Sequence, residues 1–255
     1  TSYEKDALEL FAMELATGQV SQLTSGGAVN VEPRFSPDGR RIAFVSTSYN
    51  GRFHIFVAEF SRGALSNMQR LTGKERTSLP RYYYSAYDHE ISPAWSPDGT
   101  EIIFISNRGH LYGTGGIWRM KAEAGAERRE LFSEETTWRA RPDWSPDGKR
   151  VVFASYAGRN WHQLWVLPAE GGYAFPISYG EYDNTAARWA PDGRSIAFIS
   201  NRAGNTSLWL QEAVGGAQSE LASKERKYRA AMGRLRITVL DEFGKPTAAR
   251  ISVTG

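Results

Sequence analysis

The sequence of 255 residues contains no cysteine, which excludes disulfide bonds, thiolate metal sites and a cysteine nucleophile. It also lacks any apolar run near the roughly 20 residues that a membrane-spanning helix needs, so we expect no membrane span. An excess of one charge is missing as well, because 31 basic residues stand against 28 acidic ones. A net charge of +3 without clustering argues against nucleic acid as a partner.

Sequence motifs of common catalytic sites are absent too. There is no Gly-x-Ser-x-Gly nucleophile elbow, no His-Glu-x-x-His and no His-x-His, and the four histidines stand apart from one another. The glycine-rich run at 113–116 is not followed by the lysine of a phosphate-binding loop. We therefore expect no catalytic residue, no metal and no cofactor in this stretch, although the question of enzymatic activity stays open.

The sequence does contain a repeat built around a Pro-Asp-Gly turn. Four copies occur, at 35–39, 95–99, 144–148 and 189–193. Six residues after each aspartate stands a phenylalanine, and eight residues after it stands a serine: Phe44 and Ser46, Phe104 and Ser106, Phe153 and Ser155, Phe198 and Ser200. Self-similarity at this period indicates an array of similar supersecondary units.

Each copy is predicted to hold four short strands. Pro-Asp-Gly is turn chemistry, because proline presets φ, aspartate bonds the backbone ahead and glycine tolerates a positive φ. The flanking runs, such as 41–46 and 101–106, are short, β-branched or aromatic and nearly alternating, which is typical of strands. Four antiparallel strands in each ~40–50 residues are the pattern of propeller blades. The sequence therefore predicts an all-β propeller with four complete blades.

The phrase x-Pro-x-Trp-Ser-Pro-Asp-Gly-x-x-Ile-x-Phe-x-Ser resembles the repeat of TolB-like β-propellers, with residues 92–106 as its clearest copy. The resemblance covers roughly residues 5–223. It implies a periplasmic or secreted bacterial protein, because such repeats occur in the periplasmic Tol assembly and ahead of secreted metallohydrolase domains. They also occur beside prolyl-oligopeptidase-type peptidases and in oligogalacturonate lyases. The order of elements most resembles the propeller region of a larger secreted hydrolase.

Both ends of the chain are expected to be incomplete. Residues 1–26 match the outer strands of a partial blade, residues 27–223 hold the four blades, and residues 224–255 match a linker and a β-hairpin. In one account the hairpin supplies the inner strands of the first blade and closes a five-bladed ring. In the other, the chain is part of a six- or seven-bladed ring, and the hairpin begins a following β domain that would be a partner within the same parent chain.

Residues that the repeat explains are assigned to packing, and the others are candidates for binding. Six of the 8 tryptophans lie at repeated positions and are predicted to fill the core between blades, whereas Trp138 and Trp161 have no repeat role. Nine of the 12 tyrosines and these two tryptophans fall on loops at one end of the blades, which we call the top face: 24–31, 46–53, 73–90, 106–116, 133–141, 155–162, 178–186 and 200–207. Exposed aromatics concentrated on one face indicate an interaction surface, although long loops also need aromatics to pack on themselves.

The candidate binding residues lie on the top-face loops or next to them, and those at the entries of the inner strands are expected closest to the axis. They are Tyr84, Tyr87, His89, Glu90, His110, Trp138, Arg139, Arg141, Trp161, His162, Tyr182 and Asp183. Glu32 and Arg141 hold equivalent positions in two blades and are expected to pair across the channel mouth, either as a structural ion pair or as ligand contacts.

The sequence thus predicts a non-catalytic binding scaffold that presents an aromatic-rich top face to a peptide, a glycan or a protein, accessory to a hydrolase domain in the parent protein. The alternative is a metal-assisted polysaccharide lyase or hydrolase centred on the channel. That alternative requires His89, His110 and His162 to converge in space from neighbouring blades.

Overall fold

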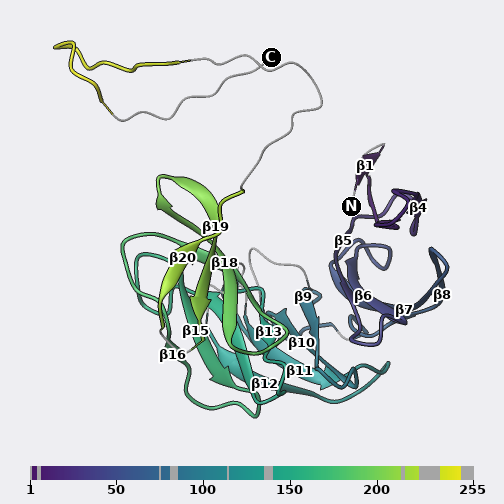
Figure 1. Cartoon of the computed structure of the whole chain (residues 1–255). Helices are drawn as coiled ribbons and strands as arrows, with labels where there is room; N and C mark the ends of the chain where they lie inside the picture. The colour runs from purple at the N-terminus through teal and green to yellow at the C-terminus, as the bar shows by residue number, and fades with distance from the viewer. Residues whose placement is uncertain are drawn as a thin grey trace. The chain divides into compact units, whose positions relative to one another are not determined.

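The sequence repeat folds into four antiparallel sheets of four strands each, the blades of a β-propeller (Figure 1). The computed structural model describes residues 2–4, 7–74, 76–80, 86–113, 115–134, 140–213, 216–223 and 236–247. All regular structure in these ranges is strand, so no helix among them could cross a membrane. The all-β propeller predicted from the repeat is confirmed.

The first two blades are regular four-stranded meanders. Blade 1 consists of β5 (Asn30–Phe35), β6 (Arg41–Ser46), β7 (His54–Ser61) and β8 (Ala64–Arg70). Blade 2 consists of β9 (Glu90–Trp95), β10 (Glu101–Ser106), β11 (Gly116–Lys121) and β12 (Arg128–Ser133). Each strand pairs with the next one along the chain, because the connecting turns are too short for any crossover.

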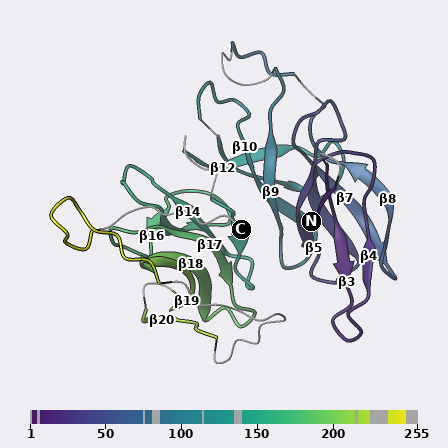
Figure 2. The same ribbon diagram turned by 90° about the horizontal axis from the view of Figure 1, so that it is seen from above.

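The other two blades repeat the same plan. Blade 3 consists of β13 (Asp143–Trp144), β14 (Arg150–Ser155), β15 (Gln163–Pro168) and β16 (Phe175–Pro176). Blade 4 consists of β17 (Asn184–Trp189), β18 (Ser195–Ala203), β19 (Asn205–Glu212) and β20 (Gln218–Glu220). The blades follow one another along an arc, with the first strand of each blade toward its inside (Figure 2).

The N-terminal residues form two small sheets ahead of blade 1. Their strands are β1 (Ser2–Glu4), β2 (Ala7–Glu9), β3 (Phe11–Met13) and β4 (Val20–Gln22), and β1 pairs with β2 and β3 with β4. These strands lie in the region 1–26, for which the sequence predicts the outer strands of a partial blade, and that assignment stays a prediction. Leu8 joins them to blade 1, since its N–H donates to the carbonyl of Ala28 at 3.2 Å.

The core of the fold lies in the seams between adjacent blades. The four repeated phenylalanines have no exposed surface there, and four of the six repeated tryptophans are buried with only 6–9% exposed: Phe44, Phe104, Phe153 and Phe198, with Trp95, Trp144, Trp165 and Trp189. Each blade has an apolar face that must pack against the next blade. This requirement is the same in every blade, so the same residue recurs at the same distance from the Pro-Asp-Gly turn. The packing role predicted for these residues is confirmed.

The tryptophan at the end of each of the inner strands β9, β13 and β17 lies against an arginine of the preceding blade. The guanidinium of Arg41 lies 4.6 Å above the ring of Trp95, and its Nη2 donates to the carbonyl of Gly99 at 2.6 Å. Arg119 over Trp144 and Arg150 over Trp189 repeat the arrangement in the next two seams. These cation–π contacts hold neighbouring blades at a fixed spacing near the axis.

Residues 222–255 form a separate unit from residues 1–221. Its described part contains a tight turn in which the Asp241 carboxylate accepts the N–H groups of Phe243 and Lys245, and Leu240 pairs with Pro246. The predicted second strand of this hairpin, 249–253, lies outside the described residues. Both accounts of the chain ends and the three domain boundaries therefore stay predictions.

Candidate functional site at the propeller axis

Each blade has one residue in the left-handed backbone region, on its inner strand in blades 1, 2 and 4 and two residues before that strand in blade 3. The φ angles are +54° at Glu32, +54° at Ser92, +42° at Arg141 and +54° at Ala186. These positions are equivalent in the repeat, and in blades 1, 2 and 4 the strand register slips there, which marks a β-bulge. The left-handed conformation costs a non-glycine residue about 1–2 kcal/mol. A repeated bulge of this kind re-aims side chains next to the axis.

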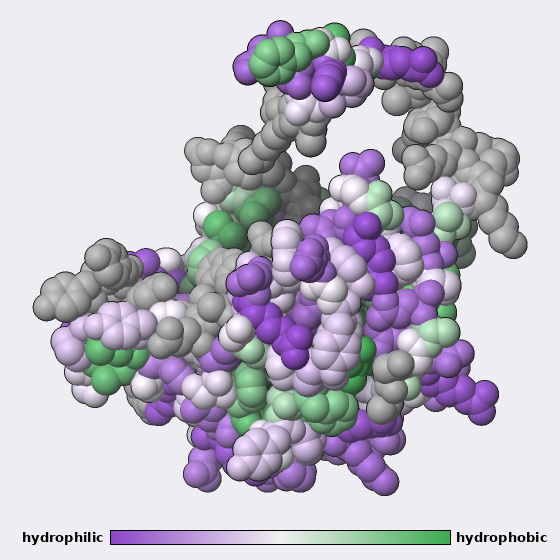
Figure 3. Space-filling view, turned by 90° about the vertical axis from the view of Figure 1, so that its left-hand side faces the viewer, coloured by the Kyte–Doolittle hydropathy of each residue, from purple (hydrophilic) through white to green (hydrophobic). Residues whose placement is uncertain are grey.

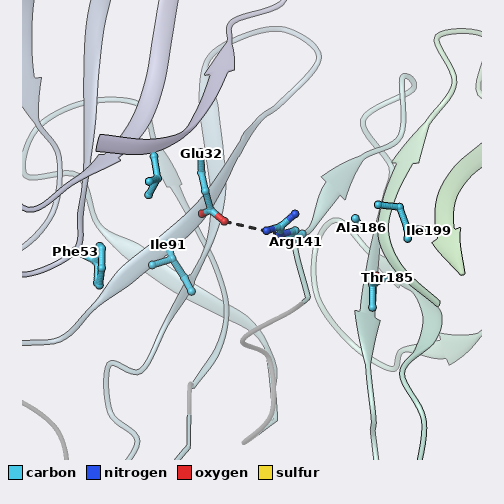
Figure 4. Close-up of a pocket in the computed structure, with 8 residues that line it drawn as sticks. Glu32, Phe53, Ile91, Arg141, Thr185, Ala186 and Ile199 are labelled. Carbon is cyan, nitrogen blue, oxygen red and sulfur yellow. Dashed lines mark ion pairs between the residues drawn. The ribbon is translucent and has the colours of Figure 1, made fainter. Parts of the chain in front are cut away.

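An axial cavity of about 490 Å³ lies beside these bulges (Figure 4). Four blades supply its lining, which consists of Val31, Glu32, Phe53, Ile91, Arg141, Thr185, Ala186 and Ile199. The walls are apolar except for one hydroxyl and one ion pair. A concave, apolar site with few polar groups is the usual form of a ligand pocket.

The ion pair of the cavity joins Glu32 of blade 1 to Arg141 of blade 3. Arg141 Nε lies 3.9 Å from Glu32 Oε1, and the pairing predicted from the sequence is confirmed. Glu32 has closer partners in blade 2, because the Ser92 N–H donates to Oε2 at 2.6 Å and the Ser92 hydroxyl donates to Oε1 at 3.3 Å. The Arg141 side chain remains 51% exposed. The carboxylate is therefore well held, whereas the guanidinium is only loosely engaged.

A second charged layer follows further along the inner strands. It consists of Arg34, Asp143 and Arg188, each two residues beyond a bulge position. Arg188 Nη1 donates to the carbonyl of Arg141 at 2.8 Å, and Asp143 Oδ2 accepts the N–H of Trp189 at 2.9 Å. The two layers together hold three guanidinium groups and two carboxylates around the axis.

Burial shifts the pKa values of this lower layer. It raises the pKa of Asp143, a shift that the neighbouring Arg188 and Arg34 oppose. Burial, followed by repulsion from Arg34, lowers the pKa of Arg188 to about 10. The pKa of Arg34 is lowered by burial as well. The sequence analysis did not identify these three residues. A signal was present, because each of them directly precedes the aromatic residue that the repeat places at the end of an inner strand.

Several predicted site residues instead hold adjacent blades together below the top face. Glu90, predicted as a ligand contact, is only 1% exposed, and its Oε2 lies 2.8 Å from Nδ1 of the fully buried His54 in blade 1. Asn184 of blade 4 contacts Gln163 of blade 3 at the matching position. The Glu90 carboxylate therefore joins two blades and does not reach the cavity.

His162 and Asp183 form a similar contact between blades 3 and 4. Asp183 Oδ1 lies 3.1 Å from His162 Nδ1 and also accepts the backbone N–H of His162 at 2.9 Å. The ring of Tyr156 covers the imidazole at a centroid distance of 3.7 Å, and His162 is 3% exposed. These contacts fix the imidazole within the protein.

Exposed aromatic residues occur on top-face loops of all but the last blade, at Tyr49 and Tyr112 in blades 1 and 2 and at the end of blade 3, where they form a rim with the start of blade 4. Trp161 is 39% exposed and Tyr179 is 60% exposed. Arg202 lies over the ring of Tyr182 at 4.4 Å, and Arg159 lies over that of Tyr179 at 5.3 Å. The molecular face in Figure 3 is mostly hydrophilic with smaller hydrophobic areas between. The rim is thus a mixed aromatic and cationic surface.

The remaining predicted residues are scattered. His110 pairs with Glu130 at 2.6 Å, the ring of Tyr87 lies under Arg76, and the N–H of His89 donates to Asn107. Tyr84, Trp138 and Arg139 lie outside the described residues. Of the nine predicted residues that the structure describes, Arg141 alone lines the axial cavity. Within the described ranges no three His, Asp or Glu side chains converge as metal ligands.

Comparison with known proteins gives consistent matches. A family model described as the TolB beta propeller domain matches residues 126–236. The Tol-Pal system protein TolB of Francisella tularensis is 28% identical over an alignment of 148 positions, and the match covers 45% of this chain and 33% of that protein. The match thus spans about a third of the length of this curated relative.

Solved structures share the fold at low sequence identity. TolB from Acinetobacter baumannii has a TM-score of 0.66 at 20% identity, covering 84% of this chain and 48% of its own. A puromycin-hydrolyzing peptidase of Mycobacterium tuberculosis has a TM-score of 0.57 at 18% identity, covering 90% of this chain and 34% of its own.

Proposed function

We propose that this TolB-like β-propeller protein is a non-catalytic scaffold that binds part of a protein partner in its axial cavity and on the top face around it. The observation that carries the proposal is the cavity itself. Strained bulges bring side chains of four blades to one apolar space of about 490 Å³ that contains a single ion pair. Backbone strain repeated at one place is a reason to look for function there.

A protein or peptide is the partner that the comparisons support, because the curated relatives are Tol-Pal system proteins. The same likeness supports a periplasmic location. An association with a hydrolase domain in the parent protein rests on the peptidase of similar fold. The described residues offer no observation that favours the alternative of a metal-assisted lyase.

The proposal is tested with peptides selected from a random display library against the whole chain. We expect Thr185→Trp, which fills the cavity from β17, to weaken binding of the selected peptides at least about tenfold. Trp161→Ala tests the contribution of the rim in the same titrations. Isothermal titration calorimetry measures each affinity.

The matched control is Thr100→Trp, which places the same side chain on the exposed turn of blade 2 at the opposite end of the blades. It is expected to leave peptide affinity unchanged. Thermal denaturation of both variants shows whether they remain folded. Peptides that bind Thr185→Trp and Trp161→Ala as tightly as the original chain would contradict the proposed function.

A further inference from the structure

The axial charges are unequal in number. Arg34, Arg141 and Arg188 bring three positive groups to the axis, against the two carboxylates of Glu32 and Asp143. These groups come from blades 1, 3 and 4 and stand in two successive layers of the inner strands. Among the described residues, these five groups at the axis carry a net charge of about +1 when all are ionised.

Both carboxylates are already engaged by groups other than arginine. Glu32 accepts the N–H and the hydroxyl of Ser92, and Asp143 accepts the N–H of Trp189. The contact of Arg141 with Glu32, at 3.9 Å through Nε, is long and is not the forked geometry that binds carboxylates strongly. Arg141 thus keeps most of its hydrogen-bonding capacity for another anion.

Repulsion among the arginines adds to this bias. Burial is the main cause of the lowered pKa of Arg188, and repulsion from Arg34 and Arg141 lowers it further. Arg188 also donates to the backbone carbonyl of Arg141, which places the Arg188 guanidinium beside the main chain of the adjacent blade at that residue. An anion on Arg141 would offset this repulsion.

We propose that the axial cavity binds an apolar peptide segment that carries a carboxylate. This carboxylate accepts two hydrogen bonds from the guanidinium of Arg141 and replaces Glu32 as its partner. The apolar part of the segment rests against Phe53, Ile91 and Ile199. The proposal deepens the proposed function, on which it rests. Its carboxylate is either the C-terminus of the segment or an acidic side chain.

Three short peptides serve as probes in calorimetric titrations of the whole chain. N-acetyl-Leu-Leu carries a C-terminal carboxylate, N-acetyl-Leu-Leu amide carries none, and N-acetyl-Leu-Glu-Leu amide carries only an acidic side chain. We expect one of the two acidic probes to bind at least about tenfold more tightly than the neutral amide. The tighter acidic probe identifies the source of the carboxylate.

The two members of the ion pair are expected to respond in opposite directions. Arg141→Gln should abolish the preference for acidic probes, whereas Glu32→Gln should strengthen acid binding because it removes the competing carboxylate. A purely structural ion pair would make both variants weaker. Arg194→Gln, the same change on the exposed turn of blade 4, is the matched control and should leave all affinities unchanged.

Equal affinity for the acids and the amide overturns carboxylate selection, and so does the absence of saturable acid binding up to about 10 mM. Weaker acid binding by Glu32→Gln overturns it as well. Display peptides whose affinity falls in Thr185→Trp but does not depend on a carboxylate would contradict this inference and leave the proposed function standing. Display peptides indifferent to both Thr185→Trp and Trp161→Ala would instead remove the proposed function.

Discussion

Single residues show how burial separates binding groups from structural ones. The sequence predicts both Glu90 and Arg141 as ligand contacts; Glu90 begins the inner strand of blade 2, and Arg141 lies two residues before the inner strand of blade 3. Glu90 is 1% exposed and joined to His54, whereas Arg141 is half exposed, has a left-handed backbone and lines the cavity. Charged residues that are buried need partners within the protein, so Glu90 is assigned to the contact between blades.

This assignment predicts that Glu90→Ala destabilises the protein by about 3 kcal/mol, because the buried His54 and the nearby Arg128 lose their acidic partner. Urea denaturation followed by tryptophan fluorescence measures the loss. Peptide affinity should not change in conditions where the variant is folded.

His110→Ala is the control, since the ion pair of His110 with Glu130 is much more accessible and should contribute less than about 1 kcal/mol. Equal losses of stability for the two variants would contradict the structural role of Glu90.

At the scale of elements, the turn between the first two strands of a blade is a hydrogen-bonded unit. In blade 2 the Ser96 hydroxyl donates to Asp98 at 2.6 Å, and the same aspartate accepts the N–H of Thr100. These bonds, the serine first, hold the pKa of Asp98 below its ordinary value of 3.8. Asp38 and Asp147 have the equivalent serine and backbone partners in their own turns, and their pKa values are lowered as well. Blade 4 differs, because Ala190 stands in place of the serine.

A folded-state pKa below the unfolded value means that the turns stabilise the protein above about pH 4 and lose this effect as pH falls through the folded pKa. We expect the triple variant Asp38→Asn, Asp98→Asn, Asp147→Asn to show a smaller fall of the urea midpoint between about pH 5 and pH 2.5. Parallel midpoint curves for the triple variant and the original chain would refute this source of acid sensitivity.

Asp192→Asn, in the turn without a serine, is the matched control. It should alter the acid limb of the curve less than Asp98→Asn does.

On the scale of the whole propeller, stability comes from the seams. Phe153 has no exposed surface and belongs to the core cluster between blades 2 and 3. Phe35 occupies the position that tryptophan holds in the other three copies, yet it is 54% exposed and contacts Phe60 edge-on at 5.0 Å. Phenylalanine is thus fully buried at position 153 and half exposed at position 35, because a neighbouring sheet covers the first ring more completely than the second.

Phe153→Ala is predicted to destabilise the propeller by about 3–5 kcal/mol, because it opens a cavity in a closed seam. Phe35→Ala should cost less than about 1.5 kcal/mol, since much of its ring already contacts water. The free energies of unfolding in urea test both values. Similar losses for the two variants would show that the seams are not the main source of stability.

The sequence by itself determined the strands, the turns and the aromatic packing between blades. These features depend on local spacing, and the Pro-Asp-Gly turn with its phenylalanine six residues later recurs in all four copies. It also placed Glu32 and Arg141 in equivalent positions, so their pairing could be predicted.

Only the tertiary structure decided which charged residues meet at the axis and which are buried between blades. Arg34, Asp143 and Arg188 look like ordinary strand residues until three blades bring them together. Glu90 and His162 look like top-face ligands until the adjacent blade covers them. The physical reason is that exposure and electrostatic environment depend on neighbours distant in sequence, which a repeat of local spacing does not encode.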